Sequence, residues 1–396
     1  MQIPFSLSLF SLVALAPLLA TWAHVEDERL WGSLKNAEWP AIRWSALRSG
    51  EFAEQYTDAF ESHLGLRGWA TYADNTARRK LLGASKPSAD AQLGEEGVLY
   101  HLDDLVHFSK RRAQLPSTED IASTLDTLAS LQRRMASRGQ ALIPVLVPGK
   151  GSLYPSQVPR GYQFPFGDPR PSDEAVYHAI VAGLQARDVR YVDGRAILTS
   201  GVYPVEQMWG RQARHWSHYS VCLVMREVRA TYTHMLHASL PDYPCTLRNQ
   251  KRVDLMHEDY DLVRISNAWD VELSSPTEPE VAYPAVNSKS NSAPSMLLVG
   301  TSFFNSLGRT AVESQLFGPV DLNYYNKQFL NLKGGADVPL RLHTDSWRAA
   351  TQGKNIYLVD LYEAYFPGTY LKEFLKELDD DMGAAPSAAL VTSAAP

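Results

Sequence analysis

Two short segments of the chain carry residues that could perform acyl transfer. The apolar run 297–299 breaks at a Gly-Thr-Ser turn, so that Ser302 follows a strand and precedes a helix. A serine hydroxyl in that position lies at the carboxyl end of a sheet, where free N–H groups at a helix N-terminus could stabilise an oxyanion. The upstream string 214–217 supplies His215, a candidate base. Each segment alone has a structural alternative, because serine often caps helices and histidine often only packs.

The elements that must position these residues alternate between strands and amphipathic helices. A helix is predicted over 117–139, with acids in its first turn and apolar residues on one face, and an apolar strand follows at 141–147. Pro144 interrupts that strand and favours an edge or irregular position. The alternation continues with a helix from 171, a strand at 189–192, a helix from Ser217, and strands at 296–299 and 356–359. It predicts an α/β fold with a mainly parallel sheet flanked by helices.

The first residues have the composition of an export signal. Residues 3–22 are almost entirely apolar or small and carry no charge, and the chain turns polar at 24–28. Cleavage after Ala23 would make 1–23 a signal peptide, whereas retention would make the same segment an anchor to the inner membrane. The composition is compatible with both, and either one predicts an exported protein.

Other segments are predicted from composition. We expect an N-terminal helical region over 24–89, a long surface loop over 274–294, and a disordered tail over 383–396. Cys222 and Cys245 are the only cysteines, and an oxidising compartment would permit them to form a disulfide. The alternative is two separate buried thiols.

Composition and charge exclude several classes of function. The 396 residues are 45% hydrophobic and 21% charged, which is enough for a full core in one large domain or two unequal ones. The net charge of −6 and the scattered lysines and arginines offer no basic field, so we expect no nucleic-acid partner. Because neither zinc-site spacing nor a phosphate-binding glycine motif occurs, we expect no metal and no cofactor.

Four motifs in a fixed order give the chain a family resemblance. They are Gly-Glu-Glu-Gly-Val-Leu-Tyr at 94–100, Leu-Val-Pro-Gly-Lys-Gly-Ser-Leu-Tyr-Pro at 146–155, His-Trp-Ser at 215–217 and Leu-Leu-Val-Gly-Thr-Ser-Phe at 297–303. The chain resembles the AlgJ/AlgX family of periplasmic polysaccharide O-acetyltransferases over an SGNH-hydrolase-like domain spanning about 90–370. As in that family, and unlike ordinary SGNH hydrolases, the histidine precedes the serine.

The resemblance implies a role for each residue that matches a family motif. Ser302 matches the nucleophile that takes an acetyl group, and His215 matches the base that activates it and later deprotonates a sugar hydroxyl. Lys150 and Tyr154 match a segment expected to line the pocket, with a plain turn as an equal alternative. The substrate-binding residues expected are Trp216, Arg214, Thr301, Lys150 and Tyr154.

One position departs from the family pattern. Family members typically carry an aspartate two residues before the histidine, and this chain has Ala213 there. In serine proteases, loss of the acid that orients the histidine costs about 10⁴ in rate. Three alternatives follow. Glu206 or Asp193 supplies a carboxylate to His215 from elsewhere in the fold, or Ser302 and His215 work slowly without a carboxylate. In the third alternative, the domain has lost catalysis and kept polymer binding.

The resemblance implies a periplasmic O-acetyltransferase that acetylates an exopolysaccharide through a Ser–His acyl-enzyme mechanism, with alginate as the first candidate and acetylated cellulose or a related polymer as the second. It also implies partners, namely a membrane-bound acyltransferase that donates acetyl groups and other exopolysaccharide-export proteins. Two alternatives stay open. A catalytically impaired member of the family would act as a polysaccharide-binding scaffold, and a secreted carbohydrate acetylesterase would use the same residues with water as acceptor.

Overall fold

Two compact units make up the chain. The computed structural model describes residues 15–25, 27–31, 37–82, 90–109, 116–163, 172–243, 245–251, 260–271, 279–282, 293–330, 332, 338–339 and 344–383. The first unit comprises Met1–Asp103, Arg211–Arg214 and Asp259–Ser275, and the second comprises Asp104–Gly210, His215–Glu258 and Pro276–Pro396. Ser302 and His215 both belong to the second unit.

The first unit is built mainly from helices. Its elements are α2 (Trp44–Ser49), α3 (Glu51–His63), α4 (Arg67–Leu82), the antiparallel pair β1 (Ala91–Leu93) and β2 (Leu99–His101) around η1 (Glu95–Gly97), and α13 (Asp261–Ile265). An ion pair of 2.8 Å joins Arg79 on α4 to Asp270, beyond α13. Across all the described ranges of the chain, no helix combines the length and apolar character needed to span a bilayer.

The second unit contains a seven-stranded sheet with the order β10-β9-β8-β7-β11-β3-β4. Its strands are β3 (Ala141–Val147), β4 (Val192–Asp193), β7 (Met296–Gly300), β8 (Val320–Tyr324), β9 (Gln328–Leu330), β10 (Val338–Pro339) and β11 (Ile356–Tyr362). The five strands from β8 to β4 are parallel, and β9 and β10 continue the sheet antiparallel. The predicted α/β fold with a mainly parallel sheet is therefore confirmed.

The strand sequences explain this arrangement. Every residue of β3, β7 and β11 is buried, as expected of near-continuous apolar strands covered by helices on both faces. The edge position inferred from Pro144 is wrong, because β3 lies between β11 and β4. Pro144 is tolerated there because β4 pairs with β3 only at Val145 and Leu146. No residue of β4 is therefore paired with the proline.

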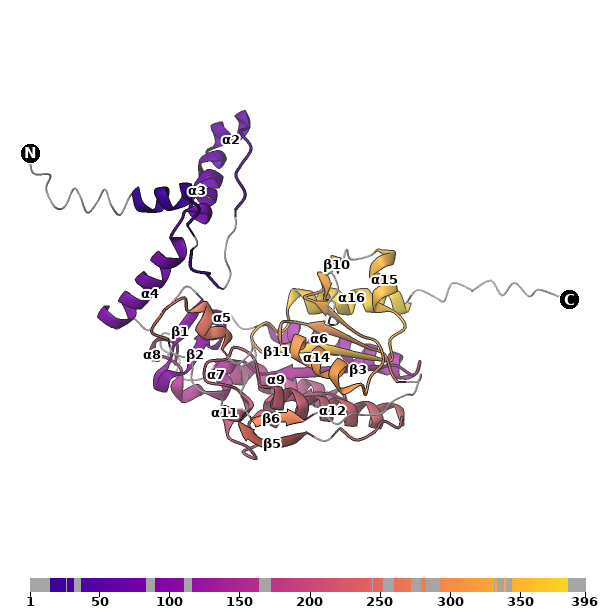
Figure 1. Cartoon of the computed structure of the whole chain (residues 1–396). Helices are drawn as coiled ribbons and strands as arrows, with labels where there is room; N and C mark the ends of the chain where they lie inside the picture. Colours follow the sequence, from indigo (N-terminus) through magenta and orange to yellow (C-terminus); the bar gives the residue numbers. More distant parts are fainter. Residues whose placement is uncertain are drawn as a thin grey trace, which may run out of the picture. The chain divides into compact units, whose positions relative to one another are not determined.

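Helices cover both faces of the sheet. On one face, α6 (Thr118–Ala136), α9 (Ser172–Ala186) and α16 (Thr369–Gly383) share a core with β3, β7 and β11. The helices α12 (His218–Leu236) and α14 (Phe303–Ser314) pack together and against the sheet, and α12 and α16 lie on opposite sides of it in Figure 1. The predicted helix starts are confirmed at α6 and α12, where Ser117 and Ser217 accept hydrogen bonds as N-caps.

Shorter elements complete the second unit. They are α5 (Leu102–Phe108), which starts at the unit boundary, α7 (Lys150–Leu153), η3 (Pro155–Gln157), α8 (Arg160–Gln163), α10 (Gly194–Leu198), α11 (Val205–Met208), α15 (Asp345–Thr351) and the antiparallel pair β5 (Thr246–Lys251) and β6 (Pro279–Ala282). Strand β6 lies inside the segment for which we predicted a loop. Most of that segment, the predicted tail beyond 383, and residues 1–14 of the predicted signal lie outside the described residues.

The predicted disulfide is present. Cys222 on α12 is bonded to Cys245, which lies just before β5, and the two Cα atoms are 5.8 Å apart. The alternative of two separate thiols is thereby excluded. In the chain-entropy picture, a cross-link closing a loop of this length stabilises the fold by about 3 kcal/mol.

Candidate active site

Ser302 occupies the turn between β7 and α14. Its backbone is helical, with a φ of −59°, and its side chain forms no capping bond to the helix. The hydroxyl instead lies 2.8 Å from Nε2 of His215, a residue 87 positions earlier in the chain. The capping alternative considered for Ser302 is therefore not what this structure contains. A serine Oγ within hydrogen-bond reach of an imidazole is the arrangement of a nucleophile and its base.

Phe303 links the candidate nucleophile to the candidate base through packing. Its ring is 4.9 Å from the imidazole of His215, in an edge-on orientation. The same ring contacts Trp209, Trp216 and Tyr362 at centroid distances of 5.5, 5.8 and 4.8 Å. Because Phe303 directly follows Ser302, this aromatic cluster couples the position of the imidazole to that of the serine turn.

Trp216 belongs to this cluster and is fully buried. Its indole N–H donates to the Oγ of Ser306 at 3.0 Å, on the first turn of α14. We expected Trp216 to bind substrate. The structure places it in the core, where its ring packs against apolar neighbours and its indole N–H is hydrogen-bonded. Its location fits a residue that orients the adjacent His215.

Thr301 is also turned inward. Its backbone N–H and its hydroxyl donate to one oxygen of Asp360 on β11, at 3.0 and 2.6 Å. The residue is buried, and its hydroxyl supports the turn in this structure, so its contact with a substrate stays a prediction. Gly300 makes this approach possible, because a Cβ at that position would lie 2.4 Å from the Cβ of Asp360.

Asp360 is a fully buried carboxyl group beneath the nucleophile turn. Burial raises the pKa of Asp360 to about 7, although the two hydrogen bonds from Thr301 act in the opposite direction. Sequence reasoning missed this residue. A signal was present, since Asp360 is the one charged residue in the apolar strand β11.

Lys150 and Tyr154 support the segment that leads to His215. Lys150 is fully buried, and its Nζ donates to the carbonyl of Gly210 at 3.2 Å. The hydroxyl of buried Tyr154 donates to the carbonyl of Trp209. We expected both residues to line a pocket, and here they hold the backbone at 209–210 through buried hydrogen bonds. Their contact with a substrate stays a prediction.

Arg214 differs from the other expected residues because it is grouped with the first unit. Its backbone N–H donates to the carboxylate of Asp261 at 2.7 Å, within that unit. Ala213, the departure from the family pattern, is buried beside it. A role for the Arg214 guanidinium toward substrate is a prediction that these contacts do not test.

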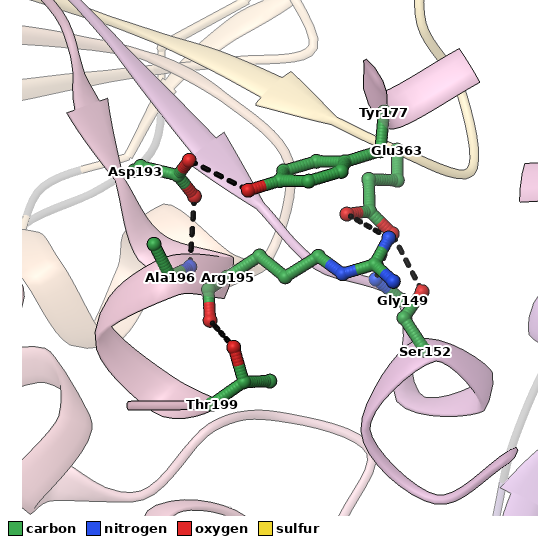
Figure 2. Close-up of polar contacts among 8 residues, drawn as sticks. All are labelled: Gly149, Ser152, Tyr177, Asp193, Arg195, Ala196, Thr199 and Glu363. Atoms are coloured by element: carbon green, nitrogen blue, oxygen red, sulfur yellow. Dashed lines mark hydrogen bonds and ion pairs between the residues drawn. The ribbon is translucent and has the colours of Figure 1, made fainter. Parts of the chain in front are cut away.

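Glu363 joins the carboxyl ends of three strands (Figure 2). One of its oxygens accepts from the backbone N–H of Gly149 at 3.2 Å and from Ser152 at 2.7 Å, after β3. The other faces Arg195 of α10 at 3.4 Å, and that guanidinium lies 4.4 Å from the ring centre of Tyr177. Glu363 is almost fully buried, so these partners compensate a carboxylate removed from water.

Asp193 is engaged in the same network. One oxygen accepts from the Tyr177 hydroxyl at 2.8 Å, and the other accepts from the backbone N–H of Ala196 at 2.9 Å as the N-cap of α10 (Figure 2). Both oxygens therefore have structural partners. Of the two acids proposed to orient His215, Asp193 has a capping role here, and Glu206 lies on α11.

Helix α11 is connected to the residues that flank His215. The carbonyl of Met208, at the end of α11, accepts from the backbone N–H of Ser217 at 2.9 Å and from the Ser220 hydroxyl at 2.6 Å. These bonds fix the start of α12 against α11.

The described part of the chain contains no cluster of three or more His, Cys, Asp or Glu side chains that could hold a metal ion.

A comparison with protein-family models identifies one family. A family profile described as SGNH hydrolase-like domain, acetyltransferase AlgX, matches residues 92–310, which is slightly more than half of the chain. No curated protein matches the chain in sequence.

Solved structures are similar at low identity. The O-acetyltransferase domain of Pseudomonas putida AlgJ matches with a TM-score of 0.42 and 14% identity, over 74% of this chain and 99% of that chain. Pseudomonas aeruginosa AlgX matches with a TM-score of 0.41 and 12% identity, over 73% of this chain and 66% of that one. Bacillus cereus PatB1 matches with a TM-score of 0.41 and 10% identity, over 65% and 93% of the two chains.

Proposed function

Because the chain belongs to the family of AlgX-type, SGNH hydrolase-like acetyltransferase domains, we propose that it is a periplasmic O-acetyltransferase acting on an exopolysaccharide, with alginate as the first candidate. The observation that carries the proposal is the 2.8 Å separation between the Ser302 hydroxyl and Nε2 of His215. A membrane-bound acyltransferase and exopolysaccharide-export proteins are the proposed partners.

The proposed reaction has two halves. In the first, Ser302 attacks the carbonyl of an acetyl donor while His215 accepts the serine proton, and the histidine then protonates the leaving group. In the second, His215 removes a proton from a sugar hydroxyl that attacks the acetyl-serine. The new ester forms on the sugar, and the proton returns to Ser302.

Backbone N–H groups at the start of α14 are the proposed oxyanion donors. The amides of Phe304 and Asn305 already donate to the carbonyls of Thr301 and Ser302, at 3.0 and 3.1 Å, and the Thr301 amide donates to Asp360. The amides of Ser302 and Phe303 come before the first of these bonds inside the helix. We assign them to the negative charge that develops on the acetyl oxygen.

Glu206 is the proposed orienting acid. It lies on α11, which is hydrogen-bonded to the residue that starts α12 two positions after His215. A carboxylate at the second ring nitrogen would hold the imidazole in the tautomer that presents Nε2 to Ser302 and would stabilise the imidazolium. The carboxylate of Asp193 already caps α10.

The experiment that tests the proposed function follows acetyl release from a chromogenic acetyl ester. The wild type should release chromophore faster than Ser302→Ala by a factor of at least about 10³, since the nucleophile is lost. Equal rates would remove Ser302 from the mechanism. Addition of mannuronate oligosaccharide should then move acetyl groups onto the sugar, whereas an acetylesterase would continue to release acetate. A protein that binds the oligosaccharide without ester turnover would be a scaffold.

A further inference from the structure

A cavity beside the nucleophile turn is not used by the reaction described above. It has a volume of about 720 Å³. One wall is the turn between β8 and β9, and the other is the segment between β11 and the second turn of α16. The lining residues that matter below are Tyr325, Lys327, Tyr365, Phe366, Thr369 and Glu373.

Hydrogen bonds join both walls of this cavity to the strands on which the Ser302 turn depends. The backbone N–H of Tyr325 donates to the carbonyl of Gly300 at 2.9 Å, two residues before the nucleophile. On the other wall, the hydroxyl of Tyr370 donates to the carbonyl of Asp360 at 3.2 Å, the residue that holds Thr301. Both walls are thus bonded to the strands β7 and β11 that carry the nucleophile turn and its support.

Aromatic contacts give a second connection between the cavity and the catalytic pair. The rings of Phe303 and Tyr362 are 4.8 Å apart, and the rings of Tyr362 and Tyr365 are 5.2 Å apart. Phe303 also contacts the imidazole of His215. A continuous row of rings therefore leads from the base to the cavity wall.

The β8–β9 turn holds its residues in an unusual conformation. Tyr325 and Asn326 both have positive φ values, 50° and 54°, which cost side-chain-bearing residues about 1 kcal/mol or more each. The amide of Asn323 donates to Asn326 at 2.8 Å, and the indole of Trp347 donates to the same oxygen at 3.3 Å. These bonds hold the turn, with the Tyr325 ring edge-on to Tyr370, and Lys327, which follows Asn326, lines the cavity.

The lining combines aromatic rings with two opposite charges. Tyr325 and Tyr365 are partly exposed, and Lys327 and Glu373 are exposed. Within the described residues, no ion pair or side-chain hydrogen bond occupies the Lys327 ammonium or the Glu373 carboxylate. Aromatic faces suit the C–H face of a sugar ring, a cation suits a uronate carboxylate, and a carboxylate can accept from sugar hydroxyls.

We propose that this cavity binds one uronate residue of the acceptor polysaccharide, adjacent to the sugar that is acetylated, with Lys327 contacting the uronate carboxylate. The inference rests on the proposed function for its substrate class. The inference adds a binding subsite formed by the β8–β9 turn and the start of α16. It assigns the preference for an anionic polymer to the side chain of Lys327.

The test measures binding without turnover. An unacetylated mannuronate hexamer is titrated calorimetrically into full-length Ser302→Ala protein, alone and combined with Lys327→Ala, Lys327→Arg or Thr369→Trp. We expect Lys327→Ala to weaken binding about tenfold or more, Lys327→Arg to retain most of it, and Thr369→Trp to weaken it by filling the cavity. A neutral mannohexaose should bind more weakly than the uronate hexamer and should not respond to Lys327→Ala.

Lys372→Ala is the matched control, because Lys372 is an exposed lysine on the same helix, paired with Asp120 at 2.7 Å and outside the cavity lining. Its binding should equal that of the parent protein. The proposal is overturned if Lys327→Ala and Thr369→Trp bind the hexamer as tightly as the parent, or if Lys372→Ala loses as much affinity. Because these titrations need no turnover, they are independent of the ester assay, in which equal rates for wild type and Ser302→Ala would reject the proposed function instead.

Discussion

Asp360 accepts two hydrogen bonds from Thr301, the residue immediately before the nucleophile. The contact follows from the sheet order, because β7 and β11 are parallel neighbours with Val299 opposite Val359, so the next residues also meet. The position of Ser302 therefore depends on a buried carboxyl group in the adjacent strand. The motif that contains the serine gives no indication of this partner.

Asp360 should make stability depend on pH. Burial raises the pKa of this carboxyl from 3.8 to about 7 in the folded chain. The folded state thus binds the proton more tightly than the unfolded state, so the stabilisation is fully present below about pH 4 and is lost as pH rises through about 7. We expect calorimetric melting temperatures of the wild type to fall between about pH 4 and 7 relative to Asp360→Asn, which mimics the neutral acid. Parallel profiles for the two proteins would contradict this assignment.

Substitutions of Glu206 and Asp193 should have different effects on activity and stability. Glu206→Gln is expected to lower kcat for acetyl-ester turnover by up to about 10⁴ with little change in melting temperature, because only the orientation and charge stabilisation of His215 are lost. Asp193→Asn should retain activity and lose no more than about 1 kcal/mol of stability from the α10 cap and the Tyr177 contact. Steady-state kinetics and thermal melts on both variants check this. The reverse pattern would make Asp193 the orienting acid, and full activity in both would leave the dyad working without one.

Arg195 should be essential for folding stability. It is the cationic partner of the buried Glu363, and Arg195→Met would leave that carboxylate without its charge partner, at a cost of about 3–5 kcal/mol. Adding Glu363→Gln to the same protein should recover much of the loss in urea unfolding. Arg190→Met is the control, because Arg190 is exposed and its contact with Asp188 is 3.9 Å, so a change below about 1 kcal/mol is expected. Equal losses of unfolding free energy in Arg195→Met and Arg190→Met would show that the ion pair with Glu363 contributes no more to stability than an exposed contact.

The disulfide should contribute measurably to stability. The double variant Cys222→Ala/Cys245→Ala is expected to lose about 3 kcal/mol, since its unfolded chain is no longer cross-linked. Reducing agent should lower the melting temperature of the wild type and leave that of the double variant unchanged. A wild type that is insensitive to complete reduction would contradict the prediction.

The fold was predictable because its signals are local. Apolar runs at 141–147, 296–299 and 356–359 and the capped amphipathic helices between them determine the parallel sheet, and the structure contains them within a few residues. The edge position expected from Pro144 is wrong, because a proline is tolerated in β3 where the neighbouring strand β4 does not extend. The length of β4 is a property of the assembled sheet and cannot be read from β3.

The site was predictable only in part. Ser302 and His215 stand in short motifs, and the structure brings them together. Phe303, Asp360 and Glu363 were missed because their roles arise from contacts between distant strands and helices. The same reason explains why Trp216 and Thr301, expected to face a sugar, are buried. A motif identifies residue types near a site, and packing decides which of them point into it.

The most direct test of the central claim is the detection of an acetyl group on Ser302. Full-length protein is mixed with a chromogenic acetyl ester, quenched, digested and examined by tandem mass spectrometry, before and after addition of mannuronate oligosaccharide. We expect one added acetyl group on the peptide that contains Ser302, and we expect it to disappear as acetylated sugar forms. The Ser302→Ala protein should not carry it. Acetylated sugar or steady ester turnover in the Ser302→Ala protein at the wild-type rate, without modification of this peptide, would contradict it.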